Sequence, residues 1–107
     1  MNYPDRILQG IRFKEYQEFL YKTWLEKQGR KPKKFIAILN GLTNDLKKIG
    51  VLKHDEHLFL INHVSVLTNL LNQYLAHEPY KAKNERGNNY YSAPFKKYIK
   101  FHEPRTK

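Results

Sequence analysis

Lysine and arginine are the chemically active residues that gather most closely in this sequence. One group of five falls between positions 27 and 34, on either side of Pro32: Lys27, Arg30, Lys31, Lys33 and Lys34. The spacing of the apolar residues around them predicts that one helix ends and the next begins here. A helix N-terminus offers free backbone N–H groups and the positive end of a dipole, which together with lysine and arginine suit a phosphate. We therefore expect phosphate contacts at this turn, although charged loops are also ordinary solvated surface.

Two further basic groups occur later in the chain. The second comprises Lys81, Lys83 and Arg86, and the third comprises Lys96, Lys97, Lys100, Arg105 and Lys107. Phosphate contacts position a protein on a nucleic acid but carry no sequence information. Asparagine can pair bidentately with adenine, and arginine with guanine. Asn40 and Asn44, expected on the exposed side of the second helix, are therefore candidate base contacts, as are Asn88 and Asn89 near Arg86, although asparagine is equally a capping and turn residue.

The charge balance of the whole chain agrees with this interpretation. Twenty lysine and arginine residues face ten aspartate and glutamate residues, which gives a formal net charge of +10. Such an excess favours a polyanionic partner, namely DNA, RNA or acidic lipid headgroups. Lysine- and asparagine-rich codons of an AT-rich genome would also raise the count. They would not by themselves cluster the charges.

Catalytic and metal chemistry has little support in the sequence. There is no cysteine, which excludes disulfides, thiolate catalysis and cysteine-ligated zinc. The histidines and acids between positions 54 and 63 match no His-Glu-x-x-His pattern, and the ten acids are too scattered for a magnesium site. There is also no glycine-rich phosphate loop and no Gly-x-Ser-x-Gly motif. We expect no catalytic residue, no metal and no cofactor, and therefore no enzyme.

The elements that must position the basic groups are helices. Apolar periodicity predicts helices over 12–27, 32–49, 63–76 and from Ser92 onward, with a short turn at 58–61. Asp55, Asn62 and Ser92 are the expected caps of the last three elements. Pro79 should end the third helix, and 78–90 should be a loop. The sequence thus predicts one all-α domain over 1–107, a small bundle of four to five helices with a basic tail at 103–107.

The first two helices carry different apolar patterns. In the first, Phe13, Tyr16, Leu20 and Trp24 form one stripe, whereas Phe19, Tyr21 and Leu25 lie off it. That helix is therefore buried on more than one side, or it offers aromatic surface to a partner. In the second, the apolar residues fall within an arc of about 100°. They are Phe35, Ile38, Leu39, Leu42, Leu46 and Ile49.

The sequence shows no feature of membrane insertion or export. Its first residues lack the charged-then-apolar layout of a signal peptide. The longest apolar run, Leu58–Ile61, is far shorter than the roughly 18 residues that span a bilayer. We therefore expect a cytoplasmic protein without a membrane partner.

Several stretches resemble a known family. Residues 19–25 (FLYKTWL) and 29–42 (GRKPKKFIAILNGL) resemble the opening of a helical N-terminal module found ahead of catalytic domains in bacterial restriction endonucleases and McrB-like proteins. Residues 58–61 (LFLI) and 88–101 (NNYYSAPFKKYIKF) are similar to the later part and closing helix of that module. The resemblance to the SAM-like N-terminal domain of tyrosine recombinases (phage integrases) is looser. Together these resemblances imply an all-α domain that contacts DNA beside a nuclease or recombinase. Where the family usually has a Ser or Thr cap between the first two helices, this sequence has Lys31 or Lys33.

Two functions follow as hypotheses. The first is nucleic-acid binding, most of all DNA binding, through a basic face. The alternative is a small phage or mobile-element protein that binds and modulates a protein partner such as a nucleic-acid-processing enzyme, with Tyr21, Tyr80 and Tyr90 as interface anchors. A membrane-surface domain is less well supported because the core uses the apolar faces. The sequence leaves open the choice between DNA and RNA, and the oligomeric state.

Overall fold

The fold is all-α, as predicted. The computed structural model describes the backbone of residues 3–103 and the side chains of residues 12–103, so Arg105 and Lys107 of the predicted basic tail lie outside the described residues. Its elements are α1 (Tyr3–Lys27), α2 (Pro32–Lys48), the short 3-10 helix η1 (Leu58–Leu60), α3 (Val64–Ala76), α4 (Glu78–Arg86) and α5 (Ser92–His102). Residues 3–103 contain no strand.

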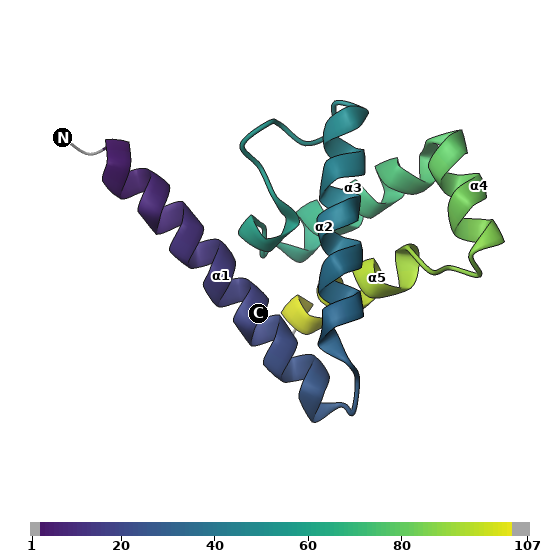
Figure 1. The fold of residues 1–107 in the computed structure, drawn as a ribbon. Helices are drawn as coiled ribbons and strands as arrows, with labels where there is room; N and C mark the ends of the chain where they lie inside the picture. The colour runs from purple at the N-terminus through teal and green to yellow at the C-terminus, as the bar shows by residue number, and fades with distance from the viewer. Residues whose placement is uncertain (1–2, 104–107) are drawn as a thin grey trace.

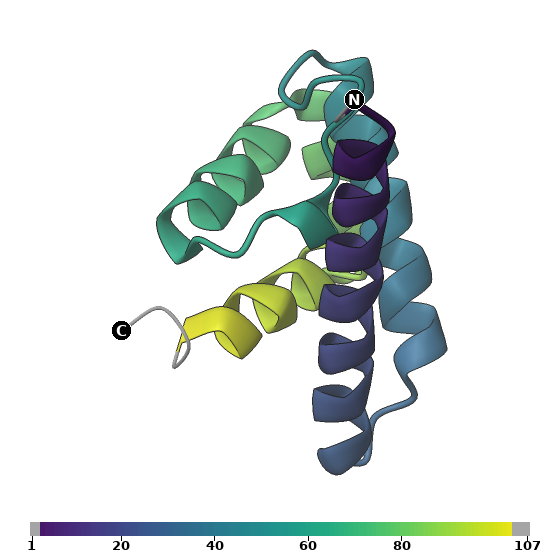
Figure 2. The same cartoon turned by 90° about the vertical axis from the view of Figure 1, so that its left-hand side faces the viewer.

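Helix α2 lies at the centre of the arrangement. Helices α1 and α2 meet at the turn 28–31 and diverge from it, whereas α3 and α5 cross behind α2 in this view and α4 lies on the other side of α2 from α1 (Figure 1). Turned by 90°, α1 and α2 run alongside each other, and α3 and α5 project to one side of them (Figure 2). None of the helices in residues 3–103 combines the length and apolar character needed to cross a bilayer.

Aromatic side chains join α1, η1 and α5 in the core. The ring of Tyr98 meets those of Tyr21 and Phe59 edge-on, at centroid distances of 5.2 and 5.3 Å. The Tyr21 hydroxyl donates to the carbonyl of Pro94 at 3.2 Å. The Tyr98 hydroxyl lies 3.0 Å from the carbonyl oxygen of Leu58 and so ties η1 to α5. Edge-to-face rings add to the stabilisation from buried area, so this cluster fixes the angle between the helices.

The buried face of α1 differs from the predicted stripe. Its buried residues are Gln17, Tyr21 and Leu25, whereas Phe13 and Tyr16 are 40% and 59% exposed. Residues four apart share a helix face, so either series satisfies the periodicity. Contact with Phe59 and Tyr98 selects the face that carries Tyr21. By contrast, the apolar arc predicted for α2 is confirmed, since Ile38, Leu39, Leu42 and Leu46 are buried and Phe35 and Ile49 half-buried.

Polar side chains of α2 hold the long connection to α3. The backbone N–H of Leu58 donates to the Thr43 hydroxyl at 3.3 Å, and the Nε2 atom of His57 lies 2.9 Å from Oδ1 of Asn40. His57 also caps η1, because its Nδ1 accepts from the backbone N–H of Phe59 at 3.0 Å. The caps predicted for η1 and α3 were wrong. His57, and not Asp55, caps η1. The residue that precedes α3 is His63 rather than Asn62, and its side chain forms no capping bond.

The predicted loop at 78–90 is mostly a helix. Pro79 does not end α3 but occupies the first turn of α4, where a missing N–H costs nothing. The single buried residue of α4 is Asn84, whose Oδ1 accepts from the N–H groups of Tyr91 and Ser92 at 3.1 and 2.9 Å. Its Nδ2 donates to the Ser92 hydroxyl at 3.0 Å. Ser92 is therefore the first residue of α5 and not its cap, and Asn84 satisfies the N–H groups at the start of that helix.

Candidate nucleic-acid interface

The basic turn, defined as Lys27, Arg30, Lys31, Lys33 and Lys34, is exposed at all five positions. Backbone groups alone shape it. The N–H groups of Gln28 and Arg30 both donate to the Leu25 carbonyl at 3.0 Å, and Gly29 has a φ of +74°, which favours glycine. Because no side chain is needed to close the turn, its cationic side chains are available to a ligand; one of them, Lys34, also has its Nζ 4.9 Å from the centroid of the Tyr90 ring.

The first turn of α2 offers additional positive potential. Lys31 precedes the helix in an extended conformation, and its side chain forms no capping hydrogen bond. Pro32 follows at the start of the helix, and the first turn has no acidic residue. The N–H groups of this turn are thus left to solvent or to an anionic ligand, in line with the missing Ser or Thr cap noted in the sequence.

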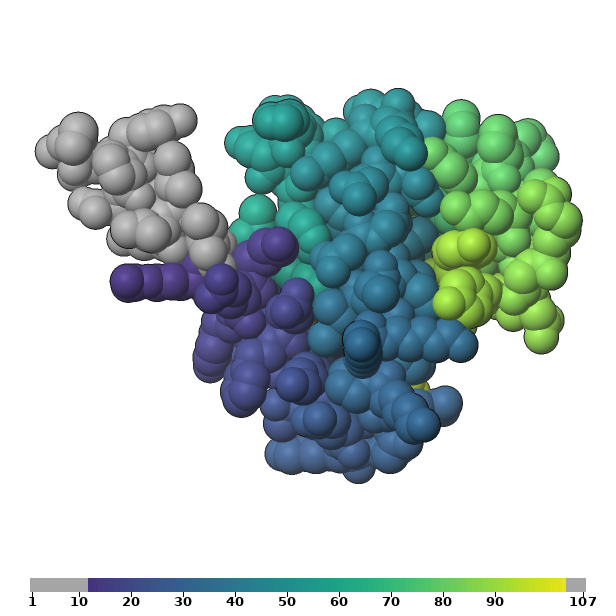
Figure 3. Space-filling view, in the orientation of Figure 1, coloured from purple at the N-terminus to yellow at the C-terminus, as the bar shows by residue number. Residues whose placement is uncertain are grey.

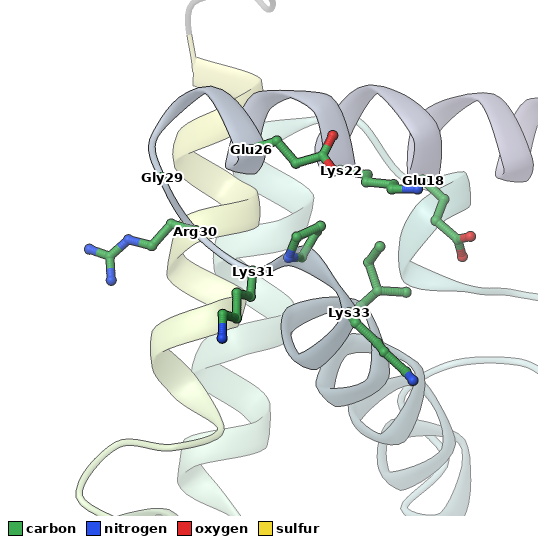
Figure 4. A pocket seen from close by; sticks show the side chains of 9 residues that line it. Glu18, Lys22, Glu26, Gly29, Arg30, Lys31 and Lys33 are labelled. Carbon is green, nitrogen blue, oxygen red and sulfur yellow. The ribbon is translucent and has the colours of Figure 1, made fainter.

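A hollow of about 630 Å³ lies in the angle between α1 and α2. Its lining residues are Glu18, Lys22, Glu26, Gly29, Arg30, Lys31, Pro32, Lys33 and Ile36. The α1 wall carries two carboxylates, which oppose a polyanion. The side chains of Arg30 and Lys31 extend away from Glu18 and Glu26 (Figure 4). Phosphates are therefore expected on the outer rim of the turn rather than deep in this hollow.

The structure brings parts of the other basic groups close to the basic turn. The Nζ of Lys97 lies 5.7 Å from the centroid of the Trp24 ring, beside the last turns of α1. Lys34 and Lys83 line one smaller hollow, although they are far apart in the sequence. Lys83 also forms an ion pair of 3.6 Å with Asp45. The remaining predicted cations, Arg86, Lys96 and Lys100, are exposed, and none of them lines either hollow.

The structure places the four predicted base contacts in different environments. Asn44 is exposed on α2, as expected. Asn40 is not on the exposed side: it is half-buried, and its Oδ1 is bonded to His57. Asn88 and Asn89 have φ values of +56° and +66° and form the left-handed reversal before α5, so their first role is structural. Asn44 is the candidate base contact that the geometry keeps.

Aromatic exposure was only partly foreseen. Tyr21, an anticipated interface anchor, is wholly buried, and Tyr80 is half-buried and stacks on Tyr74 at 5.0 Å. Tyr90 is 42% exposed. The surface instead includes Phe13, Tyr16 and Phe19 on α1, the last at 60% exposure. The sequence had raised aromatic surface on this helix as an alternative, but periodicity alone did not indicate which face would carry it.

The pKa of His57 is strongly shifted from its ordinary value. Burial, followed by the positive charges of Lys14 and Lys47, lowers its pKa to about 4. The ring is therefore neutral at pH 7, which its Nδ1 requires in order to accept from Phe59. Within the described residues, no three histidine, aspartate or glutamate side chains come together as a metal site would need. We assign His57 a structural role.

Fold alone does not establish function, and function must be argued from the site itself. The resemblance of residues 19–25, 29–42, 58–61 and 88–101 to the restriction-endonuclease module stays a prediction. Comparisons of this chain with protein-family models, curated proteins and solved structures found no match.

Proposed function

We propose that this chain binds nucleic acid, DNA in the first place, through phosphate contacts of the basic turn. One observation carries the proposal: five exposed cations surround the start of a helix whose first turn has neither a side-chain cap nor an acidic residue. Charge and dipole act in the same direction at such a point, and a phosphate satisfies both. Lys83, Arg86, Lys96, Lys97 and Lys100 supply the surrounding positive field.

The exposed face of α2 suits close approach to a nucleic-acid backbone. Ala37 and Gly41, two small residues, follow Lys33 and Lys34 on exposed positions of the helix. Space above Gly41 is open, since a Cβ added there would meet no atom within 4 Å. A phosphate backbone can lie along this face, with Asn44 at its far end as the base contact. The resemblance noted in the sequence suggests an accessory role beside a cytoplasmic nuclease or recombinase.

The test is a salt series with a labelled random duplex and a matched pair of charge reversals. Lys31→Glu/Lys33→Glu removes two cations of the basic turn, whereas Lys48→Glu/Lys53→Glu changes the same net charge at exposed positions at the far end of α2 and just beyond it. Between about 50 and about 200 mM salt, each lost phosphate contact lowers the log–log slope by about 0.9. We expect the first variant to lose about two units of slope and at least about tenfold in affinity.

The control variant should change affinity by less than about threefold, because exposed charges beyond a Debye length are largely screened. Equal losses in the two variants would show that net charge and not the basic turn drives binding. No binding of the unmodified chain at about 50 mM salt would overturn nucleic-acid binding as a whole. An RNA hairpin measured in the same series decides between the two nucleic acids.

Exposed aromatic rings on α1 favour a second candidate, binding to a protein partner such as a nucleic-acid-processing enzyme. Phe13, Tyr16 and Phe19 are 40–60% exposed at three-residue spacing, so they share one side of the helix. Large aromatics are frequent interface anchors. Such an association would persist at about 0.5 M salt, where phosphate contacts fail, and would be lost in Tyr16→Ser/Phe19→Ser.

A further inference from the structure

A second hollow, of about 350 Å³, lies between α2 and the segment that leads into α5. We call it the tyrosine hollow and define it by six of its lining residues: Lys34, Gly41, Asp45, Lys83, Tyr90 and Tyr91. The segment that carries the two tyrosines lies against α2 on the face shown in the space-filling view (Figure 3). Neither its shape nor its composition was anticipated from the sequence, because Lys34 and Lys83 come from distant positions.

The walls combine flat rings with paired cations. The rings of Tyr90 and Tyr91 are nearly perpendicular, at 84° and a centroid distance of 5.1 Å. The Nζ of Lys34 lies 4.9 Å from the Tyr90 centroid, and the Nζ of Lys83 lies 4.4 Å from that of Tyr91. Each ammonium thus sits over an aromatic face at cation–π distance. Tyr90 is 42% exposed and leaves ring surface accessible to a ligand.

The floor of the tyrosine hollow is a single face of α2. Lys34, Gly41 and Asp45 are seven and four residues apart, which places them on one side of the helix. Gly41 keeps the floor low, since an added Cβ would enter open space. The Asp45 carboxylate, 16% exposed, stands at the opposite end from Lys34 and pairs with Lys83 at 3.6 Å. The hollow therefore offers the carboxylate oxygens of Asp45 as acceptors beside the Lys83 ammonium, with the Lys34 ammonium at its other end.

Buried groups fix the position of the tyrosines. Asn84 accepts from the Tyr91 N–H at 3.1 Å. A Cβ at Gly87 would come within 3.1 Å of the Tyr90 Cβ, so glycine permits the close approach of the chain there. Asn88 and Asn89 complete the left-handed reversal. The rings are thus set by the fold before any ligand arrives, which lowers the entropic cost of binding.

We infer that the tyrosine hollow binds one unpaired nucleobase of a single-stranded nucleic acid. The base stacks on the exposed ring of Tyr90, the flanking phosphates pair with Lys34 and Lys83, and Asp45 accepts from an exocyclic amine. Aromatic rings with nearby cations are the usual receptors for single strands, because every base has a π-face. An acidic peptide fits less well, since Asp45 would repel it. The volume lies at the lower end of the range of about 300–1,000 Å³ for ligand sites, as expected for a single nucleotide.

This inference rests on the proposed function and narrows it. The basic turn contacts phosphates of any strand, whereas the tyrosine hollow requires a base that is free of its pairing partner. A duplex keeps its bases stacked inside and cannot fill the hollow without extruding one. Preference for single strands, or for junctions with unpaired bases, therefore follows from the hollow and not from the turn.

The experiment measures binding of the full chain to a single-stranded ten-nucleotide DNA that carries 2-aminopurine, and to the corresponding duplex. Gly41→Leu fills the floor and leaves the fold intact, because leucine is a better helix former than glycine. Ser65→Leu places the same side chain at an exposed position of α3 outside the tyrosine hollow and is its control. Tyr90→Leu removes the stacking ring, and Tyr90→Phe keeps it.

We expect Gly41→Leu and Tyr90→Leu to weaken single-strand binding about tenfold and to abolish the quenching of 2-aminopurine. Tyr90→Leu should leave duplex affinity within about twofold. Tyr90→Phe should bind and quench as the unmodified chain does, and Ser65→Leu should retain the quenching. Duplex binding that is sensitive to Lys31→Glu/Lys33→Glu, with single-strand binding indifferent to Tyr90→Leu, would overturn the inference and leave the proposed function in place. Absence of binding to either DNA would overturn both.

Discussion

The basic turn and the α4–α5 corner (residues 87–91) both reverse the chain between two helices, but different groups hold them. At the basic turn, backbone N–H groups of Gln28 and Arg30 close on the Leu25 carbonyl. At the corner, a buried side chain, Asn84, accepts from two backbone N–H groups and donates to Ser92. One reversal is independent of its side chains, and the other depends on one of them.

The difference decides what each region can do. Cations at the basic turn are exposed and attached to a backbone that does not need them, so they can serve a ligand without a cost in stability. At the corner, Lys83 is held by Asp45 and by the Tyr91 ring. Freely solvated cations give strong, salt-dependent and unspecific attraction, whereas fixed rings and cations give geometric selectivity. If the proposed function holds, the basic turn supplies the unspecific attraction and the tyrosine hollow the selectivity.

Removal of the side chain that holds the corner should have the largest effect on stability. Asn84→Ala leaves the N–H groups of Tyr91 and Ser92 and the Ser92 hydroxyl without their buried partner. Each unsatisfied buried group costs about 1–3 kcal/mol. We expect the free energy of unfolding in urea to fall by about 3 kcal/mol.

Asn72→Ala, at an exposed position of α3, is the matched control and should change the free energy of unfolding by less than about 0.5 kcal/mol. A loss below about 1 kcal/mol for Asn84→Ala would show that the corner does not depend on this residue.

Acid should destabilise the segment 49–63, which connects α2 to α3 and is held in place by side chains. Burial, then Lys14 and Lys47, lower the pKa of His57 from 6.5 to about 4. The unfolded chain therefore takes up the proton first as pH falls. The contribution of His57 to stability is complete above pH 6.5, falls between pH 6.5 and about pH 4, and is level below that. Partial exposure of the ring screens some of the effect, so we expect a loss of about 1–2 kcal/mol over this interval.

Urea unfolding at a series of pH values measures this dependence. His57→Asn is the control, because its side-chain oxygen can accept from Phe59 in place of Nδ1 but does not titrate. The difference between the unmodified chain and this variant isolates His57 from the other histidines. Parallel curves for the two proteins would contradict the assigned role of His57.

The success of the sequence interpretation depended on where each element finds its partners. The apolar arc of α2 is local information, so that helix and its buried face were predicted. Helix α4 was missed because its buried residue is an asparagine, a typical turn residue, and its bonding partners Tyr91 and Ser92 belong to the next element. In α1, two aromatic series share the same period. Only distant contacts to Phe59 and Tyr98 decide between them.

The same distinction between local and distant contacts applies to the residues of the candidate site. Clustering along the chain was enough to locate the basic turn, because its members are neighbours in sequence. The tyrosine hollow joins Lys34 of α2 to Lys83 of α4 and Tyr90 of the corner, so only the tertiary structure could reveal it. The placement of Asn40 failed for a related reason, since its hydrogen-bond partner His57 lies on another element.

The smallest expected effect concerns a single residue of the basic turn, Lys31, at which one substitution should raise stability and lower affinity. Lys31 occupies the N-cap position of α2 without a capping bond. Lys31→Ser supplies a hydroxyl that can accept from the first-turn N–H groups, so we expect a gain of about 0.5–1 kcal/mol in the free energy of unfolding. The same change removes a phosphate contact and occupies N–H groups that a phosphate would use, so duplex affinity should fall.

The control for this prediction is Arg30→Ser, which removes the same charge outside the cap position and should weaken binding without any gain in stability. If Lys31→Ser raised stability and left affinity unchanged, the start of α2 would not be where phosphates bind. If the two variants lost affinity equally and neither gained stability, the missing cap would carry no meaning for function, and the cations alone would define the basic turn.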